Sequence, residues 1–224
     1  DSPDLHYSDT IKAGAGLVDP TAARILVDEA PDRIADLISL GVTFDTLDGE
    51  ITLAMEGAHT VPRVLHAGGD ATGANIERTL SSLVRENHNI SIFEDHLDTQ
   101  MLVKNGRTYG IKTVDCKTGS ERVFEGKYLV LATGGSGMLY KHTTNPPVAT
   151  GTGIAVAYLA GTLVSDMEFF QFHPTALFMP GVPRFLISEA VRGEGGILRN
   201  SRGEAFARKY HPDGELAARD IVSR

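Results

Sequence analysis

The chain has 224 residues, a formal net charge of −8 and an ordinary apolar share of 42%. The length allows a sizeable hydrophobic core, and the acidic balance argues against nucleic acid or an anionic membrane surface as a partner. No run approaches the roughly 18 apolar residues of a membrane span, and the single cysteine, Cys116, excludes an internal disulfide. We therefore expect a cytoplasmic protein with no membrane partner.

The first forty residues predict one interrupted helix. Residues 1–20 contain no strand or start signal, which suggests that the chain is an internal piece of a longer protein. Residues 21–40 carry apolar side chains at helical spacing and end before Gly41. Because Pro31 lies within this pattern, we expect a kink or a division into two helices.

Short strands and a second helix are predicted next. Residues 42–57 are typical of short strands around an Asp48–Gly49 turn, and residues 74–86 form an amphipathic helical pattern. The Gly-rich stretch 68–73 that precedes this helix is typical of a phosphate or flavin loop and equally of an ordinary loop. Asp70 in this stretch is a candidate cap of the helix.

The middle of the chain predicts a sheet and a cofactor loop. Residues 90–124 alternate in short strands with NG and TG turns, which predicts an antiparallel meander. Residues 128–132 form an apolar run suited to a buried parallel strand. The run ends in Thr133, Gly134 and Gly135, where an open α/β sheet leaves room for a cofactor.

Residues 151–162 predict a helix of small residues that begins with Gly151 and Gly153, a position suited to an anion or a ring edge. A domain boundary is predicted near Met167, where this helix gives way to an aromatic run. No GxGxxG is present, so a dinucleotide-binding fold would lack its first βα turn.

The last third carries the most distinctive group of ionisable residues. Glu189 and Arg192 are three residues apart and pair if the stretch after Ser188 is a short helix. Arg219 and His173 complete a group that suits an anionic substrate which needs a proton. The same pattern is also typical of a surface ion-pair network, and spacing alone does not separate the two interpretations.

Several stretches together resemble the flavoprotein superfamily of L-aspartate oxidase, fumarate reductase and succinate dehydrogenase. They are, in order, HAGGDATG, YLVLATGG, TTNPPVATGTGIAVAYLAG, EFFQFHPTAL, EAVRGEGGIL and ELAARDIVSR. The opening DSPDLHYSDTIKAGAGLVD and the MEGAH segment are most similar to the L-aspartate oxidase branch. The resemblance implies a mixed α/β fold: an incomplete Rossmann-like FAD-binding domain with an antiparallel β-meander over residues 1–166, then the start of a capping domain over residues 167–224.

The resemblance also implies roles for individual residues. His173 resembles the histidine that binds a substrate carboxylate, Ser188 and Thr175 line the same pocket, and Glu56 resembles the acid that receives the substrate's α-ammonium group. The remaining three resemble the catalytic proton relay of the superfamily: Glu189, Arg192 and Arg219. An arginine stays protonated, so Arg219 as a donor needs a carboxylate such as Glu189 to resupply its proton.

Non-covalent FAD is the cofactor that the resemblance implies. The residues that match the family's cofactor contacts are Ala132, Thr133, Gly134, Gly135, Gly151, Thr152 and Gly153. Thr152 departs from the family, which has an acidic residue at this position. His59 and His66, which flank the MEGAH region, are interpreted as local hydrogen-bonding residues, and His6 as a solvent-facing or turn residue.

The implied reaction is hydride transfer from Cα of L-aspartate to FAD, which yields iminoaspartate in the first step of quinolinate and NAD biosynthesis. Oxygen or fumarate would then accept the electrons, and quinolinate synthase would receive the product; the chain by itself is expected to be inactive. The alternative is a fumarate reductase or succinate dehydrogenase flavoprotein subunit. A third, non-enzymatic interpretation is a domain that keeps the fold and has lost the cofactor.

Overall fold

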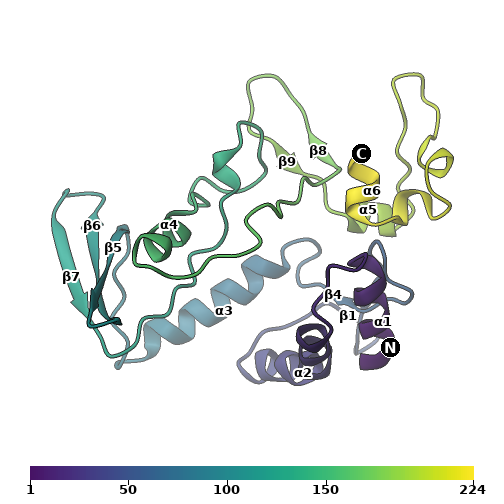
Figure 1. Ribbon diagram of the computed structural model, residues 1–224. Helices are drawn as coiled ribbons and strands as arrows, with labels where there is room; N and C mark the ends of the chain where they lie inside the picture. The colour runs from purple at the N-terminus through teal and green to yellow at the C-terminus, as the bar shows by residue number, and fades with distance from the viewer. The chain divides into compact units, whose positions relative to one another are not determined.

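The computed structural model describes residues 1–224, and the chain forms two compact units. Unit 1 contains Asp1–Ile90, Phe172–Thr175 and Ile187–Arg224, and unit 2 contains Ser91–Gln171 and Ala176–Leu186. Figure 1 labels their helices and strands. Every strand pairing is antiparallel, so the chain combines helices with small antiparallel sheets.

Unit 1 begins with α1, Pro3–Ala13, a helix that the sequence analysis missed. Ser2 is its N-cap, where the hydroxyl accepts a hydrogen bond from the Leu5 N–H at 3.2 Å. Pro3 occupies the first helical position, where its fixed φ fits and its missing N–H costs nothing. The Ser2–Pro3 pair is a helix-start signal in the sequence. It was overlooked because the helix that follows has few apolar residues.

The second helix, α2, runs without a break from Pro20 to Ser39. Asp19 caps it by accepting hydrogen bonds from the N–H groups of Thr21 and Ala22. The expected division at Pro31 is therefore wrong, since Pro31 lies within one continuous helix. Packing against α1 supports the helix, and Val27 is 1% exposed, so tertiary contacts outweigh the hydrogen bond lost at the proline.

Short strands follow in unit 1. The pair β1 (Thr46–Leu47) and β2 (Glu50–Ile51) closes around Asp48 and Gly49, whose φ values of 53° and 86° confirm the predicted turn. The strands β3 (Leu53–Ala54) and β4 (Val64–Leu65) pair next, and the segment between them, 55–63, carries Glu56. The helix α3, Thr72–Glu86, confirms the predicted amphipathic helix.

The C-terminal part of unit 1 consists of short helical turns. They are α5 (Ala190–Gly193), η2 (Ala207–Lys209), η3 (Gly214–Leu216) and α6 (Arg219–Ser223). The chain leaves the helical conformation just after α5, where Gly195 has a φ of 91° that favours glycine. Contacts between α5 and η3 bring residues 189–193 next to residues 214–217.

Unit 2 is built on the predicted meander, β5 (His96–Lys104), β6 (Arg107–Asp115) and β7 (Glu121–Glu125), in that spatial order. The turn between β5 and β6 places Asn105 and Gly106 at φ 52° and 71°, as an NG hairpin requires. The helix α4, Thr152–Leu159, packs against β5. Unit 2 also contains η1 (Gly137–Leu139) and the hairpin of β8 (Ala176–Leu177) and β9 (Phe185–Leu186).

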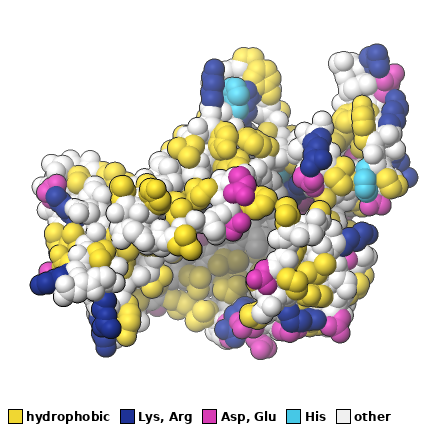
Figure 2. Space-filling model, in the orientation of Figure 1, with side chains coloured by type: hydrophobic (Ala, Val, Ile, Leu, Met, Phe, Trp, Pro, Cys, Tyr) yellow, Lys and Arg dark blue, Asp and Glu magenta, His cyan; other side chains and the backbone are white.

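The strand predicted over residues 128–132 is absent, and residues 127–136 have no regular secondary structure. Tyr128 and Val130 are 82% and 85% exposed, and apolar side chains are visible on the molecular surface (Figure 2). A parallel strand requires ladder partners on neighbouring strands, and no other segment of this chain supplies them. None of the helices has the length and apolar character needed to cross a membrane.

Candidate functional site

A buried carboxylate, Glu189, joins two arginines in unit 1. Its Oε1 accepts a hydrogen bond from Nη2 of Arg192 at 2.9 Å, and its Oε2 accepts one from Nε of Arg219 at 2.5 Å. The side chains of Glu189 and Arg192 are only 4% and 3% exposed, so this is not a surface network. Burial of a charge requires close partners, and the two ion pairs supply them.

Arg192 is held from a second direction. Its Nη1 donates to the carbonyl oxygen of Glu215 in η3 at 2.7 Å. Glu189 lies at the N-cap position of α5 and Arg192 in its last turn, so one helical turn brings the two side chains together as the spacing predicted. Arg192 is therefore a fixed buried cation.

Arg219 has a second carboxylate partner, Glu56. Its Nη2 lies 3.4 Å from Oε2 of Glu56, and the two side chains are 35% and 22% exposed. Glu56 and Arg219 are 163 positions apart in the sequence. Two carboxylates and two guanidinium groups thus form one chain of contacts, in which Glu56 and Arg219 are the solvent-accessible end.

Two glycines allow the segment that carries Glu56 to approach this cluster. A Cβ atom on Gly57 would lie 2.5 Å from Oε1 of Glu189, and one on Gly193 would lie 2.1 Å from the carbonyl oxygen of Met55. A larger residue would therefore have to displace the Glu189 carboxylate at position 57 and the backbone of Met55 at position 193. The N–H of Ala58 also donates to the carbonyl oxygen of Leu216 at 3.1 Å.

His173 and Thr175 form a local unit beside the ion pairs. The N–H of Thr175 donates to Nδ1 of His173 at 3.2 Å, and this geometry assigns the imidazole proton to Nε2. Burial, with the nearby Arg219 and Arg192, lowers the pKa of His173 below its ordinary value, so the ring is neutral at neutral pH. His173 therefore presents an N–H donor.

The hydroxyl groups of Thr175 and Ser188 differ in whether their hydrogen is free to bind a ligand. Thr175 donates its hydroxyl hydrogen to the carbonyl oxygen of Ile187 at 2.9 Å, so this group orients the backbone and His173. Ser188 accepts a hydrogen bond from the N–H of Ala190 at 3.2 Å, which leaves its hydroxyl hydrogen for another acceptor. Ser188 makes this contact from one position before the N-cap, which is Glu189.

The residues predicted for the cofactor come together in unit 2. The N–H of Gly151 donates to the carbonyl oxygen of Gly135 at 3.1 Å, which joins the 132–135 segment to the start of α4. A Cβ atom on Gly153 would lie 1.9 Å from Oγ1 of Thr133. The two glycine-containing segments, 132–135 and 151–153, are therefore in direct contact.

The geometry of these segments fits a group with acceptor oxygens. Gly134 has a φ of 71°, and a Cβ atom added to Gly134 or Gly135 would meet nothing within 4 Å. Gly151 is left-handed at the N-cap of α4, and no side chain caps this helix. The first N–H groups of α4 are thus open to an outside acceptor. Thr152, the departure from the family pattern, shares a 2.7 Å hydrogen bond with Thr150.

The Gly-rich loop before α3 is closed by the chain itself. The carboxylate of Asp45 accepts hydrogen bonds from the N–H groups of Gly68 and Gly69 at 2.8 and 2.9 Å. The ordinary-loop interpretation of this stretch is therefore the correct one for these two donors. Asp70 does not cap α3, because Ala71 is the N-cap and makes no side-chain bond.

Sequence reasoning missed a buried group around Asp9. The carboxylate of Asp9, on α1, accepts hydrogen bonds from Thr60 and pairs with Arg63. The two histidine interpretations in this region are wrong: Nδ1 of His59 is buried without a hydrogen-bond partner, and His6 is partly buried with its ring edge-on to that of His59, 6.4 Å away. The group was missed because the helix α1, which carries both His6 and Asp9, was not predicted.

Comparison with known proteins identifies the family. The model of a family described as FAD binding domain matches residues 1–224. L-aspartate oxidase of Synechocystis is 49% identical over the whole chain, and the chloroplastic L-aspartate oxidase of rice is 44% identical. The chain covers only 40% and 37% of these two proteins.

Solved structures agree. A quinol fumarate reductase of E. coli matches the whole chain with a TM-score of 0.91 and 30% identity, over 40% of its own length. Sdh1 of Mycobacterium smegmatis, solved in complex with UQ1, matches with a TM-score of 0.81 and 38% identity, over 39% of its length. The predicted superfamily resemblance and FAD as its cofactor are confirmed.

Proposed function

Because the chain belongs to the FAD binding domain family, we propose that it forms part of an FAD-dependent oxidase that converts L-aspartate to iminoaspartate. Relatives that are 44–49% identical over the whole chain carry the name L-aspartate oxidase, which supports this choice within the family. The chain spans about two fifths of the length of those relatives.

The observation that carries the proposal is the contact between Glu56 and Arg219 at the accessible end of the ion-pair chain. At 3.4 Å this contact is long, and both side chains are partly exposed, so a ligand can replace it. A zwitterion offers one group to each residue: its α-ammonium group pairs with Glu56, and a carboxylate pairs with the guanidinium group of Arg219.

The second carboxylate of the substrate requires donors that carry no counterion. His173 offers its Nε2–H, and Ser188 offers its hydroxyl hydrogen. Thr175, predicted to bind substrate, instead orients His173, because its own hydroxyl hydrogen and N–H are both engaged. This arrangement suits a dicarboxylic amino acid better than a monocarboxylic one.

Protons move through the same chain of contacts. Glu56 is positioned to accept a proton from the α-ammonium group, which must be lost before the amine becomes an imine. Arg219 is protonated at rest, so it can release a proton only if a neighbouring group returns one, and Glu189, 2.5 Å from its Nε, is the carboxylate placed to do so. Arg192 holds the other oxygen of the same carboxylate by its ion pair with Glu189.

The cofactor is proposed to lie against the two glycine segments of unit 2. The residues that would hold it are Ala132, Thr133, Gly134, Gly135, Gly151, Thr152 and Gly153. FAD supplies the hydride acceptor when it is bound. We further propose the domain division at residues 166 and 167, with an incomplete Rossmann-like FAD domain and the start of a capping domain.

The proposal extends to the cellular role. The electrons pass to oxygen or fumarate, and the iminoaspartate enters quinolinate and NAD biosynthesis through quinolinate synthase in the cytoplasm. The alternative, a fumarate reductase or succinate dehydrogenase flavoprotein subunit, is less well supported, because succinate and fumarate have no cation to pair with Glu56. The solved quinol fumarate reductase and Sdh1 structures are also less similar in sequence than the L-aspartate oxidases, at 30% and 38% identity.

Anaerobic addition of L-aspartate to the FAD-loaded protein expressed from its complete reading frame tests the proposal. We expect aspartate to bleach the flavin absorbance and succinate to leave it unchanged. Bleaching by succinate alone would reject the oxidase in favour of the dicarboxylate branch. Absence of bleaching with either compound would reject both.

A further inference from the structure

The segment 55–63, here called the Glu56 loop, is fixed from two opposite sides within unit 1. On one side it contacts the ion-pair cluster, through Gly57 against Glu189 and through the hydrogen bond from Ala58 to Leu216. These contacts orient the first half of the loop. They do not involve its second half, residues 59–63, which needs contacts of its own.

Asp9 on α1 holds that second half. Its side chain is buried, at 5% exposure, and its Oδ2 accepts hydrogen bonds from both the N–H and the hydroxyl of Thr60, at 3.0 and 2.9 Å. Thr60 follows Glu56 by four residues. The left-handed Ala58, with a φ of 65°, and the hydrogen bond from His59 N–H to the Glu56 carbonyl oxygen make the intervening turn tight.

Arg63 closes the loop at its far end. Its Nη1 lies 2.9 Å from Oδ2 of Asp9, and its Nε and Nη2 donate to the carboxylate of Asp1 at 3.1 Å. The N–H of Arg63 donates to the carbonyl oxygen of Ala54, which brings the two ends of the loop together. Asp9 therefore contacts both the middle and the end of the loop.

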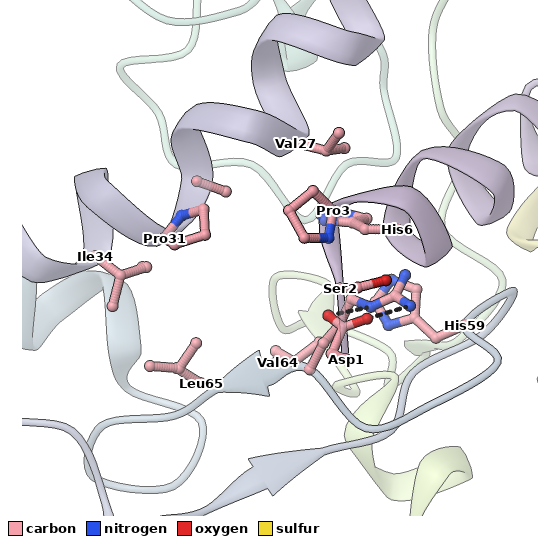
Figure 3. A pocket seen from close by; sticks show the side chains of 12 residues that line it. Asp1, Ser2, Pro3, His6, Val27, Pro31, Ile34, His59, Val64 and Leu65 are labelled. Atoms are coloured by element: carbon pink, nitrogen blue, oxygen red, sulfur yellow. Dashed lines mark hydrogen bonds and ion pairs between the residues drawn. The ribbon is translucent and has the colours of Figure 1, made fainter.

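His6 and His59 add a ring contact on the same side. Figure 3 shows these two histidines at one end of a cavity of about 570 Å³, with Asp1 beside them and α2 residues such as Val27 and Ile34 along the wall. The cavity wall is mostly apolar, and its charged residues are paired with one another, so it offers no unpaired charge to a ligand. The charged residues at this end of the cavity hold the Glu56 loop in place through their ion pairs.

Asp9 remains ionised at neutral pH. Burial raises the pKa of its carboxyl group, but the hydrogen bonds from Thr60 and the guanidinium group of Arg63 outweigh this effect and hold the pKa below its ordinary value. An uncharged side chain at this position would leave Arg63 with Asp1 as its single partner. It would also weaken the hold on Thr60.

We propose that Asp9 is a positioning residue for Glu56: the carboxylate on α1 fixes the Glu56 loop so that Glu56 stays beside Arg219. The inference rests on the proposed function for the identity of the ligand. Asp9 itself does not contact the substrate. Its effect reaches the ligand's ammonium group only through Glu56, which gives it a signature that a general structural role lacks.

The test compares Asp9→Asn with Asp4→Asn in the FAD-loaded protein. Asp4 lies on the same helix, and its side chain is 91% exposed. We expect Asp9→Asn to weaken L-aspartate binding about tenfold and to change succinate binding less than about twofold, because only aspartate uses Glu56. Asp4→Asn should match the wild-type protein for both. Equal weakening of both ligands would assign Asp9 a purely structural role and overturn the proposal.

A double-mutant cycle makes the test specific. In a Glu56→Gln background, Asp9→Asn should cause no further loss of aspartate over succinate selectivity. A full additional loss would show that Asp9 acts by another route. If Asp9→Asn fails to fold, Thr60→Val serves instead, with an expected loss of aspartate affinity of about two- to threefold, since one of the two Thr60 bonds remains.

Amide exchange separates this inference from the proposed function. Without any ligand, Asp9→Asn should accelerate exchange of the Ala58 and Thr60 amides while the α3 amides exchange as in the wild-type protein. Unchanged exchange in the loop would overturn the positioning role even if aspartate is the substrate. Accelerated exchange in a protein that binds no aspartate would uphold the positioning role and reject the oxidase.

Discussion

The two units differ in how their candidate site residues are held: unit 1 uses buried ion pairs, and unit 2 uses glycine-containing backbone segments. In unit 1, ionisable side chains pair within the chain: Glu189 and Arg192 are 4% and 3% exposed and pair with one another, and Glu189 also pairs with Arg219. In unit 2, the segment 127–136 has no ladder partner, and Tyr128 and Val130 are more than 80% exposed. One region is held by charge and the other by the small size of glycine.

The difference shows which groups must find their partners within this chain and which can remain open. A buried charge is tolerated only with a partner at hydrogen-bond distance, so the ion-pair cluster has to be closed locally. The glycine segments instead offer open backbone groups and space, as at Gly134 and Gly135. The first region should therefore respond to changes of charge, and the second to changes of volume.

The largest effect is expected from Glu189→Gln. It leaves the buried Arg192 and the partly buried Arg219 without their shared carboxylate, which should lower the free energy of unfolding by about 3–5 kcal/mol. Aspartate turnover should fall at least about 100-fold through loss of the proton-exchanging group. Denaturant unfolding and stopped-flow flavin reduction measure the two effects.

The matched control is Glu194→Gln, an exposed residue one position after α5. It should change stability by less than about 0.5 kcal/mol and leave turnover at the wild-type value. Equal losses in the two variants would mean that the cluster behaves as an ordinary surface network, and the contrast between the units would disappear.

The glycine region is tested by Gly153→Ala. The added methyl group would lie 1.9 Å from Oγ1 of Thr133, so α4 has to move away from the 132–135 segment. We expect a loss of about 1–3 kcal/mol in stability and a lower FAD content after purification. The control is Gly73→Ala, also at the second position of a helix but with nothing within 4 Å, where a gain of about 0.5–1 kcal/mol is expected. Full FAD content in Gly153→Ala would contradict the account.

The smallest effect concerns pH. The pKa of His173 is lowered by burial and by Arg219 and Arg192, so the unfolded state takes up this proton at a higher pH than the folded state. Stability should therefore fall as the pH decreases through about 6.5. His173→Gln should make stability less dependent on pH between about 7.5 and 5.5. Parallel pH profiles of the two proteins, measured by thermal unfolding, would argue that His173 is not held neutral.

Local sequence signals predicted much of the structure. The NG and DG turns, the meander, α3 and the pairing of Glu189 with Arg192 all depend on residues within a few positions of one another. The resemblance assigned Glu56 and Arg219, 163 positions apart, to one substrate site, but their direct contact was not predicted. Patterns within a few neighbouring residues cannot indicate a contact between residues so far apart in the sequence.

The failures also have physical causes. The strand over 128–132 was predicted from its composition, but a strand exists only through its neighbours, and the chain provides none there. Pro31 was expected to kink the helix or to divide it in two, and the division does not occur because packing against α1 keeps α2 continuous. The Asp9 group was missed because it depends on α1, whose weak apolar pattern gave no helical signal.

The most direct measurement is the affinity of the Glu56→Gln protein for L-aspartate and succinate, followed by perturbation of the flavin spectrum. If the ion-pair cluster recognises an amino acid, aspartate should bind about 10- to 100-fold more weakly than to the wild-type protein, because its ammonium group loses its carboxylate. Succinate should bind with unchanged or higher affinity, since Arg219 is freed from one competitor. Equal weakening of both ligands, or none, would contradict the assignment of Glu56 and with it the proposed substrate.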